Sequence, residues 1–131
     1  MPDGPEPSSP EPVLPRYGER SLSEVLPSLL GSLGVCGVAD GLAIPPVRAA
    51  GLLLVDGLGA RLLRRYAADA PFLASLPDAG PLTAGFPSST ATSLTSLGTG
   101  TPPGHHGMVG ITMRVGSGRR EIGRASCRER V

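Results

Sequence analysis

An uninterrupted apolar run, Gly51–Val55, stands between two stretches with helical spacing and ends at the pair Asp56-Gly57. A continuous apolar run of this length is typical of a strand that is covered on both faces, as in the parallel sheets of α/β proteins. The predicted order of strand, helix, strand and helix along the chain supports this interpretation. We therefore expect an α/β fold with a mostly parallel sheet flanked by helices.

The first helix is predicted to begin at Ser21. Ser21 and Glu24 have the spacing of a capping box, and aliphatic residues at helical spacing follow them. Pro27 falls in the first turn, where proline is tolerated, and Gly34 is expected to close the helix. The predicted apolar face comprises Val25, Leu26, Leu29, Leu30 and Leu33.

The remaining elements are predicted from periodicity and turn residues. Helices are expected at residues 60–70, 71–76 and 90–97. Short extended segments are expected at residues 81–86 and 109–115.

Polar side chains follow the first two predicted strands along the chain. Asp56 comes directly after the apolar run, and seven hydroxyl residues follow Phe86-Pro87: Ser88, Ser89, Thr90, Thr92, Ser93, Thr95 and Ser96. Catalytic side chains of α/β sheets lie at the carboxyl ends of strands, so we expect Asp56 and the start of this cluster to form one site. A carboxylate can ligate Mg²⁺ or Zn²⁺, and a helix N-terminus favours phosphate. The plainer alternatives are a turn at Asp56-Gly57 and hydroxyls that only cap a helix.

The composition disfavours several other functions. The chain has no lysine and a formal net charge of +1, so nothing in its charge favours a nucleic-acid duplex or an anionic membrane. Without lysine, the glycine-rich segment Gly98–Gly104 cannot be a Walker A loop. The two cysteines lack metal-ligand spacing, and the adjacent His105 and His106 are expected to point apart. With no signal peptide or transmembrane run, the expected location is cytoplasmic.

Three regions are predicted along the chain. Residues 1–16 form a Pro-rich leader that is expected to be disordered, and residues 17–120 form the domain. Residues 121–131 break with the preceding composition and back-translate to a sequence that resembles a short-read sequencing adapter. We therefore expect the last segment to be non-native and the chain to be an N-terminal fragment.

The segment Phe86–Gly100 resembles the nucleotide pyrophosphatase/phosphodiesterase branch of the alkaline phosphatase superfamily, and especially its actinobacterial members. In that branch a strand ends in Asp-Gly, and a later segment begins with Phe-Pro and ends with Thr-Gly. A His-Gly pair follows shortly afterwards. The chain has Asp56-Gly57 at the end of a predicted strand and matches the later segment in register from Phe86-Pro87 to Thr99-Gly100. His106-Gly107 follows at the family's distance.

The resemblance implies a metal-dependent phosphoesterase with an alkaline-phosphatase-like fold and a small phosphate-ester substrate. It implies two divalent metal ions, of the zinc type, with Asp56 as a ligand of one. Thr90 would be the nucleophile, with its hydroxyl on the same metal, and would form a phosphothreonine intermediate. Ser93 stands where the family has an Asn that contacts a phosphate oxygen. The family's other metal ligands lie further downstream, so the fragment by itself is expected to be inactive.

Two alternatives remain open at this stage. A degenerate relative would be a non-catalytic, phosphate-binding α/β domain, and Ser93 in place of Asn favours it. Another member of the superfamily would be a phosphomonoesterase or a phosphonate hydrolase. A sulfatase is disfavoured because no modification motif with Cys or Ser surrounds Thr90. The sequence carries no signal for an oligomeric state.

Overall fold

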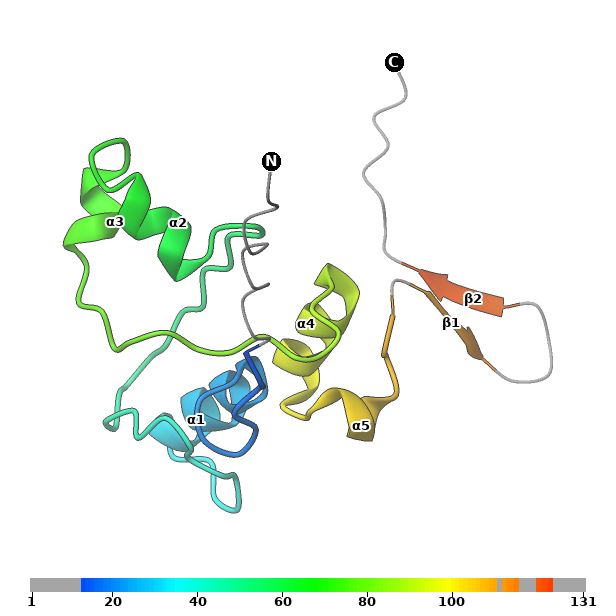
Figure 1. The fold of residues 1–131 in the computed structure, drawn as a ribbon. Helices are drawn as coiled ribbons and strands as arrows, with labels where there is room; N and C mark the ends of the chain where they lie inside the picture. The colour runs from blue at the N-terminus through cyan, green and yellow to red at the C-terminus, as the bar shows by residue number, and fades with distance from the viewer. Residues whose placement is uncertain (1–12, 111, 116–119, 124–131) are drawn as a thin grey trace, which may run out of the picture.

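The computed structural model describes residues 13–110, 112–115 and 120–123 (Figure 1). Most of the described elements are helical. In chain order they are η1 (Leu22–Glu24, a 3-10 helix), α1 (Val25–Ser32), α2 (Ala60–Arg65), α3 (Pro71–Ser75), α4 (Thr90–Thr99), α5 (Pro103–His106), β1 (Thr112–Val115) and β2 (Arg120–Gly123). Residues 1–12 of the predicted leader and residues 124–131 of the segment predicted to be non-native lie outside the described residues.

The predicted start and end of the first helix are confirmed. The Ser21 Oγ accepts a hydrogen bond from the Ser23 N–H at 3.3 Å, and Glu24 Oε2 accepts one from the Ser21 N–H at 2.7 Å. These reciprocal bonds satisfy N–H groups that a helix start otherwise leaves without partners. Just past the helix, Gly34 adopts a φ of +89°, which a side chain would disfavour.

The Glu24 carboxylate connects this cap to the preceding turn. Burial opposes its ionisation, but hydrogen bonds from Ser21, Ser23 and the Gly18 N–H outweigh burial and lower the pKa of Glu24 below its ordinary 4.5. A carboxyl with a lower pKa in the folded state stabilises the fold above its unfolded pKa. That contribution is lost as the pH falls through the folded pKa.

We expect Glu24→Gln to lower the free energy of unfolding by about 1–2 kcal/mol near neutral pH. The loss should shrink in strong acid, because the wild-type carboxyl is itself protonated once the pH falls through its folded pKa. Denaturant unfolding at both pH values measures the difference. Glu19→Gln is the matched control because Glu19 is an exposed carboxyl on the same segment. Equal losses for Glu24→Gln at both pH values would contradict the assignment.

The buried face of α1 differs from the leucine face predicted from its sequence. Val25, Ser28 and Ser32 are buried, whereas the leucines of the predicted face are half-buried or exposed. The two serines are satisfied locally, since Ser28 Oγ accepts from the Leu42 N–H at 3.1 Å and Ser32 Oγ donates to the Leu29 carbonyl at 2.8 Å. Small side chains on this face let α4 approach α1 closely, which leucines would prevent.

The strand predicted at Gly51–Val55 is not formed within the described residues. The segment is irregular, with Leu53 81% exposed and its apolar neighbours about half exposed. A parallel strand needs hydrogen-bonded neighbours, and no described segment pairs with this one. Leu53 and Val55 instead line an apolar cavity of about 520 Å³ together with Leu63 of α2 and Leu73 of α3.

The other predicted elements are confirmed to different extents. The helix expected at 60–70 ends at Arg65, because Tyr66 leaves the helical region with φ −113° and ψ 32°. The helices expected at 71–76 and 90–97 are α3 and α4. The segment expected at 81–86 forms only an isolated parallel bridge between Thr83 and Ser21. Part of the strand expected at 109–115 is β1, but it pairs antiparallel with β2 rather than in a parallel sheet.

None of the helices in the described ranges is long and apolar enough to cross a lipid bilayer.

Candidate functional site

The N-terminus of α4 carries the predicted nucleophile. Ser89 is the N-cap in extended conformation, and its Oγ accepts a hydrogen bond from the Thr92 N–H at 3.2 Å. Thr90 is therefore the first residue of the helix, and it is half-buried. The first N–H groups of a helix lack intrahelical acceptors and lie at the positive end of its dipole. A phosphate group next to Thr90 would be stabilised by both effects.

The hydroxyls of the cluster fall into two groups: those that are buried or hydrogen-bonded within the helix, and those that remain accessible. Thr92 is fully buried, and its Oγ1 accepts from the Ser89 hydroxyl at 2.9 Å. The Thr95 hydroxyl donates to the Ala91 carbonyl at 2.8 Å, and Ser96 is only 1% exposed. These three therefore serve packing and helix hydrogen bonding. The cluster hydroxyls left on the accessible side are those of Ser88, Thr90 and Ser93, with Ser89 as the cap.

Ser96 and His106 form a hydrogen-bonded pair that resembles a nucleophile and its base but cannot act as one. Ser96 Oγ lies 2.9 Å from His106 Nε2, and His106 Nδ1 accepts from the Met108 N–H at 3.0 Å. Since Nδ1 is an acceptor, the ring proton is on Nε2 and is donated to Ser96. His106 therefore cannot remove a proton from Ser96. The pair joins α5 to α4, while the neighbouring His105 is exposed.

The His106 pair makes stability depend on pH. Burial lowers the pKa of His106 below its ordinary value of 6.5. The unfolded chain then binds this proton more readily than the folded protein, so the stabilisation is complete above the unfolded pKa and is lost as the pH falls below it. We expect the unfolding temperature of the wild type to fall between pH 7.5 and 5.5, roughly the window of histidine titration.

The matched variants for this effect are His106→Gln and His105→Gln. His106→Gln should lower the unfolding temperature at neutral pH and flatten its pH dependence, whereas His105→Gln should keep the wild-type dependence. Thermal unfolding followed by circular dichroism measures both. An unchanged slope in His106→Gln would assign the pH effect to another group.

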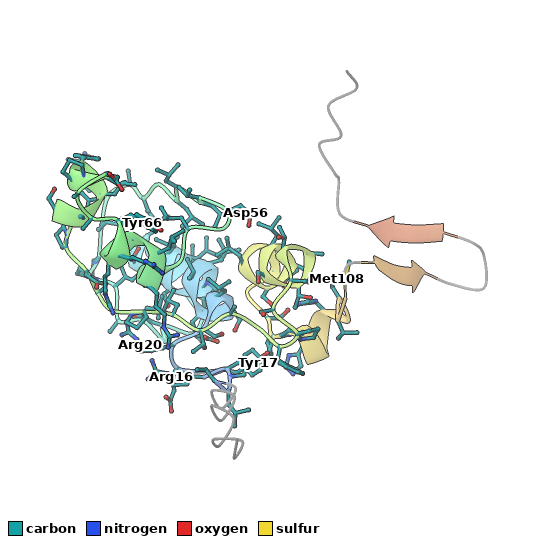
Figure 2. The ribbon with its side chains drawn as sticks, turned by 45° about the horizontal axis from the view of Figure 1, so that its top comes forward. Arg16, Tyr17, Arg20, Asp56, Tyr66 and Met108 are labelled. Atoms are coloured by element: carbon teal, nitrogen blue, oxygen red, sulfur yellow. The ribbon has the colours of Figure 1, made fainter. Side chains whose placement is uncertain are left out.

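Residues near the start of the described chain hold the segment that leads into α4. The Thr83 N–H donates to the Arg20 carbonyl at 2.9 Å, and the Leu22 N–H donates to the Thr83 carbonyl at 3.1 Å. The Phe86 N–H donates to the Tyr17 hydroxyl at 3.0 Å. Figure 2 shows Tyr17 and Arg20 on this side of the molecule. Sequence analysis missed these supports because their partners lie more than sixty residues apart.

Gly85 lets the segment before α4 pass close to α4 and α5. It is buried, and a Cβ there would lie 2.9 Å from Pro103 Cγ and 3.5 Å from Thr92 Cγ2. The shorter distance is below any normal contact, so a side chain at this position would push α5 away from the segment. No local pattern in the sequence indicated this close approach.

Asp56 lies in a turn that precedes α2 (Figure 2). Asp56 is exposed, and Gly57 has a φ of +76°, as the turn alternative requires. Thr90 and Ser93 belong to α4, and Asp56 belongs to a separate loop. Within the described residues no hydrogen bond joins Asp56 to Thr90 or Ser93.

The described residues alone do not fit a catalytic metal. They contain no group of three or more His, Cys, Asp or Glu side chains that could hold an ion. Asp56 and the Thr90 hydroxyl offer two oxygen ligands at most, whereas a catalytic zinc usually takes three protein ligands. Any metal at this site would need ligands from outside the described residues.

One comparison with known proteins found a matching family model. The family model described as "Type I phosphodiesterase / nucleotide pyrophosphatase" matches residues 52–126, which is more than half of the chain. The matched range includes Asp56, Thr90 and Ser93. Searches of curated proteins and of solved structures each returned no match.

Proposed function

Because the chain belongs to the type I phosphodiesterase / nucleotide pyrophosphatase family, we propose that it hydrolyses phosphodiester or pyrophosphate bonds with Thr90 as the nucleophile. The family implies hydrolysis of this general type. The position of Thr90 at the start of α4 supports its assignment as the nucleophile. Among the hydroxyls of the cluster, Thr90 combines partial exposure with a place at the first turn of a helix of ten residues. The substrate would be a small phosphate ester.

The proposed chemistry proceeds in two displacements at phosphorus. The Thr90 Oγ1 attacks, its proton passes to a base or to solvent, and the bond from phosphorus to the leaving oxygen breaks. The leaving group departs as an alcohol or a phosphate, and the phosphoryl group remains on Thr90 as an ester. Water then attacks this phosphorus, the bond from phosphorus to the Thr90 oxygen breaks, and the phosphate product leaves as a monoester or as free phosphate. A proton returns to Thr90 and restores its hydroxyl. Backbone N–H groups of the first turn of α4 would stabilise the phosphoryl oxygens in both steps.

We further propose that the activity depends on two divalent metal ions, of the zinc type, with Asp56 and the Thr90 hydroxyl among the ligands. The chemistry of a carboxylate and a hydroxyl suits such ions. The remaining ligands would come from outside the described residues. The same proposal assigns Gly51–Val55 to a parallel sheet in the complete α/β fold, where neighbouring strands would cover its exposed leucines.

Metal removal tests the proposed dependence. We expect full-length protein to hydrolyse bis(p-nitrophenyl) phosphate, and a chelator to lower the rate by at least about a hundredfold, as expected when a catalytic metal is lost. Adding zinc back should restore the rate, and adding magnesium alone serves as the control. A chelated, metal-free protein with an unchanged rate would exclude metal dependence. A metal-loaded protein without hydrolysis of any phosphate ester would exclude the activity itself.

Ser93 is the observation that favours a second candidate, a non-catalytic or degenerate phosphate-binding domain. Its hydroxyl is shorter than the Asn side chain of the resembling family and lies one turn into α4, where the Ser93 N–H is already bonded to the Ser89 carbonyl at 2.9 Å. Such a domain would bind phosphate without turnover.

A preference for monoesters over diesters would instead support a phosphomonoesterase. Comparing the hydrolysis rates of p-nitrophenyl phosphate and bis(p-nitrophenyl) phosphate measures that preference.

A further inference from the structure

A cavity of about 870 Å³ adjoins the segment that leads into α4, and arginines dominate its polar lining. Arg16 contributes from the N-terminal segment, and Arg61 and Arg64 contribute from α2. Residues 81–86 and Ser88 line the cavity as well. No acidic side chain is among the residues that line this cavity.

The three arginines leave a net positive charge at the cavity. Arg64 forms an ion pair with Asp78, in which Nη2 lies 3.3 Å from Oδ2. Both side chains are more than 60% exposed. This is the one ion pair within the described ranges, so Arg16 and Arg61 have no acidic partner there. Arginine keeps its charge at any ordinary pH, and its planar group matches the oxygens of phosphate. Several such groups around one cavity favour an anion by Coulomb attraction.

We propose that this cavity is an anion site that takes a second phosphate group of the substrate, held by Arg16, Arg61 and Arg64. Ser88 lines the cavity and stands two residues before Thr90, so the cavity adjoins the proposed nucleophile along the chain. A substrate with its reacting phosphorus at Thr90 can extend over Ser88 and place another phosphate among the arginines. The link to substrate rests on the proposed function, whereas the anion site itself does not.

The size and charge of the cavity favour a small polyanion over an extended one. Only three arginines line the cavity, and the chain as a whole carries a formal net charge of only +1. A nucleic-acid backbone would require a longer basic surface. A pyrophosphate unit fits such a cavity and offers oxygens to more than one guanidinium group.

Binding of inorganic pyrophosphate to the full chain tests the site directly. We expect isothermal titration calorimetry to detect binding that weakens with added salt. Arg61→Gln and Arg16→Gln, from two different segments that line the cavity, should each raise the Kd by about tenfold. Arg65→Gln is the matched control because Arg65 belongs to the same helix, lies 5.7 Å from the Tyr66 ring centroid and does not line the cavity. Equal Kd values for Arg61→Gln and Arg65→Gln, or no binding to the wild type, would overturn the proposal.

Substrate selectivity separates this inference from the proposed activity. In full-length protein, Arg61→Gln should lower kcat/KM about tenfold for a diester that carries a second phosphate, relative to the same diester without it. Arg65→Gln should leave that ratio unchanged. Hydrolysis with an unaltered ratio in Arg61→Gln would reject the anion site as a substrate site and retain the activity. Pyrophosphate binding without hydrolysis would reject the activity and retain the anion site.

Discussion

Replacing Thr90 by Ala in the full-length protein is expected to abolish turnover and the covalent phosphoenzyme. Without the hydroxyl, no phosphoryl ester can form on residue 90, and the direct attack of water must take over. Loss of a nucleophile in a covalent mechanism typically lowers kcat by at least about a thousandfold. Acid quenching during turnover, followed by mass spectrometry of the peptide that contains residue 90, measures the intermediate.

Two hydroxyl variants distinguish a chemical role of Thr90 from a structural one. Thr90→Ser keeps a hydroxyl at the start of α4 and should retain a measurable rate and a phosphorylated peptide. Thr99→Ala removes an exposed hydroxyl at the other end of the same helix, where Oγ1 donates to the Thr95 carbonyl at 2.7 Å, and should leave the rate near that of the wild type. A Thr90→Ala protein with wild-type turnover would remove Thr90 from the mechanism.

The largest effect on stability is expected at Gly100, where α4 ends against α1. Gly100 has a φ of +66°, and a Cβ there would lie 2.8 Å from Pro27 Cγ and 2.9 Å from Pro27 Cδ. A proline ring cannot rotate away as a flexible side chain can, so the two helices would have to separate. The left-handed backbone adds about 1–2 kcal/mol for any residue with a Cβ. We expect Gly100→Ala to lower the free energy of unfolding by about 2–4 kcal/mol.

Gly98 provides the matched control for this prediction on the same helix. Gly98 lies inside α4, is exposed, and has no atom within 4 Å of the position that a Cβ would take. Gly98→Ala should be neutral or should raise the free energy of unfolding by up to about 1 kcal/mol, because alanine favours the helix. Denaturant unfolding compares the two variants. Similar values for both would show that α4 does not press against Pro27 as the structure places it.

The contents of the candidate site were partly predictable from the sequence. Hydroxyls after an extended segment predicted a helix start, and α4 begins at Thr90 with Ser89 as its cap. The sequence could not say which hydroxyl stays accessible. That choice depends on Thr92 being buried and on Ser96 bonding to His106, and both result from packing between helices. The arginine cavity was likewise missed, because its lining residues come from parts of the chain that are far apart in the sequence.

Local hydrogen bonds explain why the start and the end of the first helix were predictable. The capping box joins Ser21 to Glu24, three residues apart, and the left-handed glycine Gly34 stands close behind its helix. Hydrogen-bond partners within one helical turn lie only a few residues apart in the sequence. A local pattern is therefore enough to identify them.

The sequence by itself determined the caps, the turns, the family and the position of Thr90 at a helix start. Only the tertiary structure decided that α1 buries serines rather than leucines, and that Tyr17 and Arg20 hold the segment before α4. It also left Gly51–Val55 without the strand neighbours that its apolar run predicted. The reason is physical: burial and strand pairing need partners from distant parts of the chain, whereas a cap needs only the next turn.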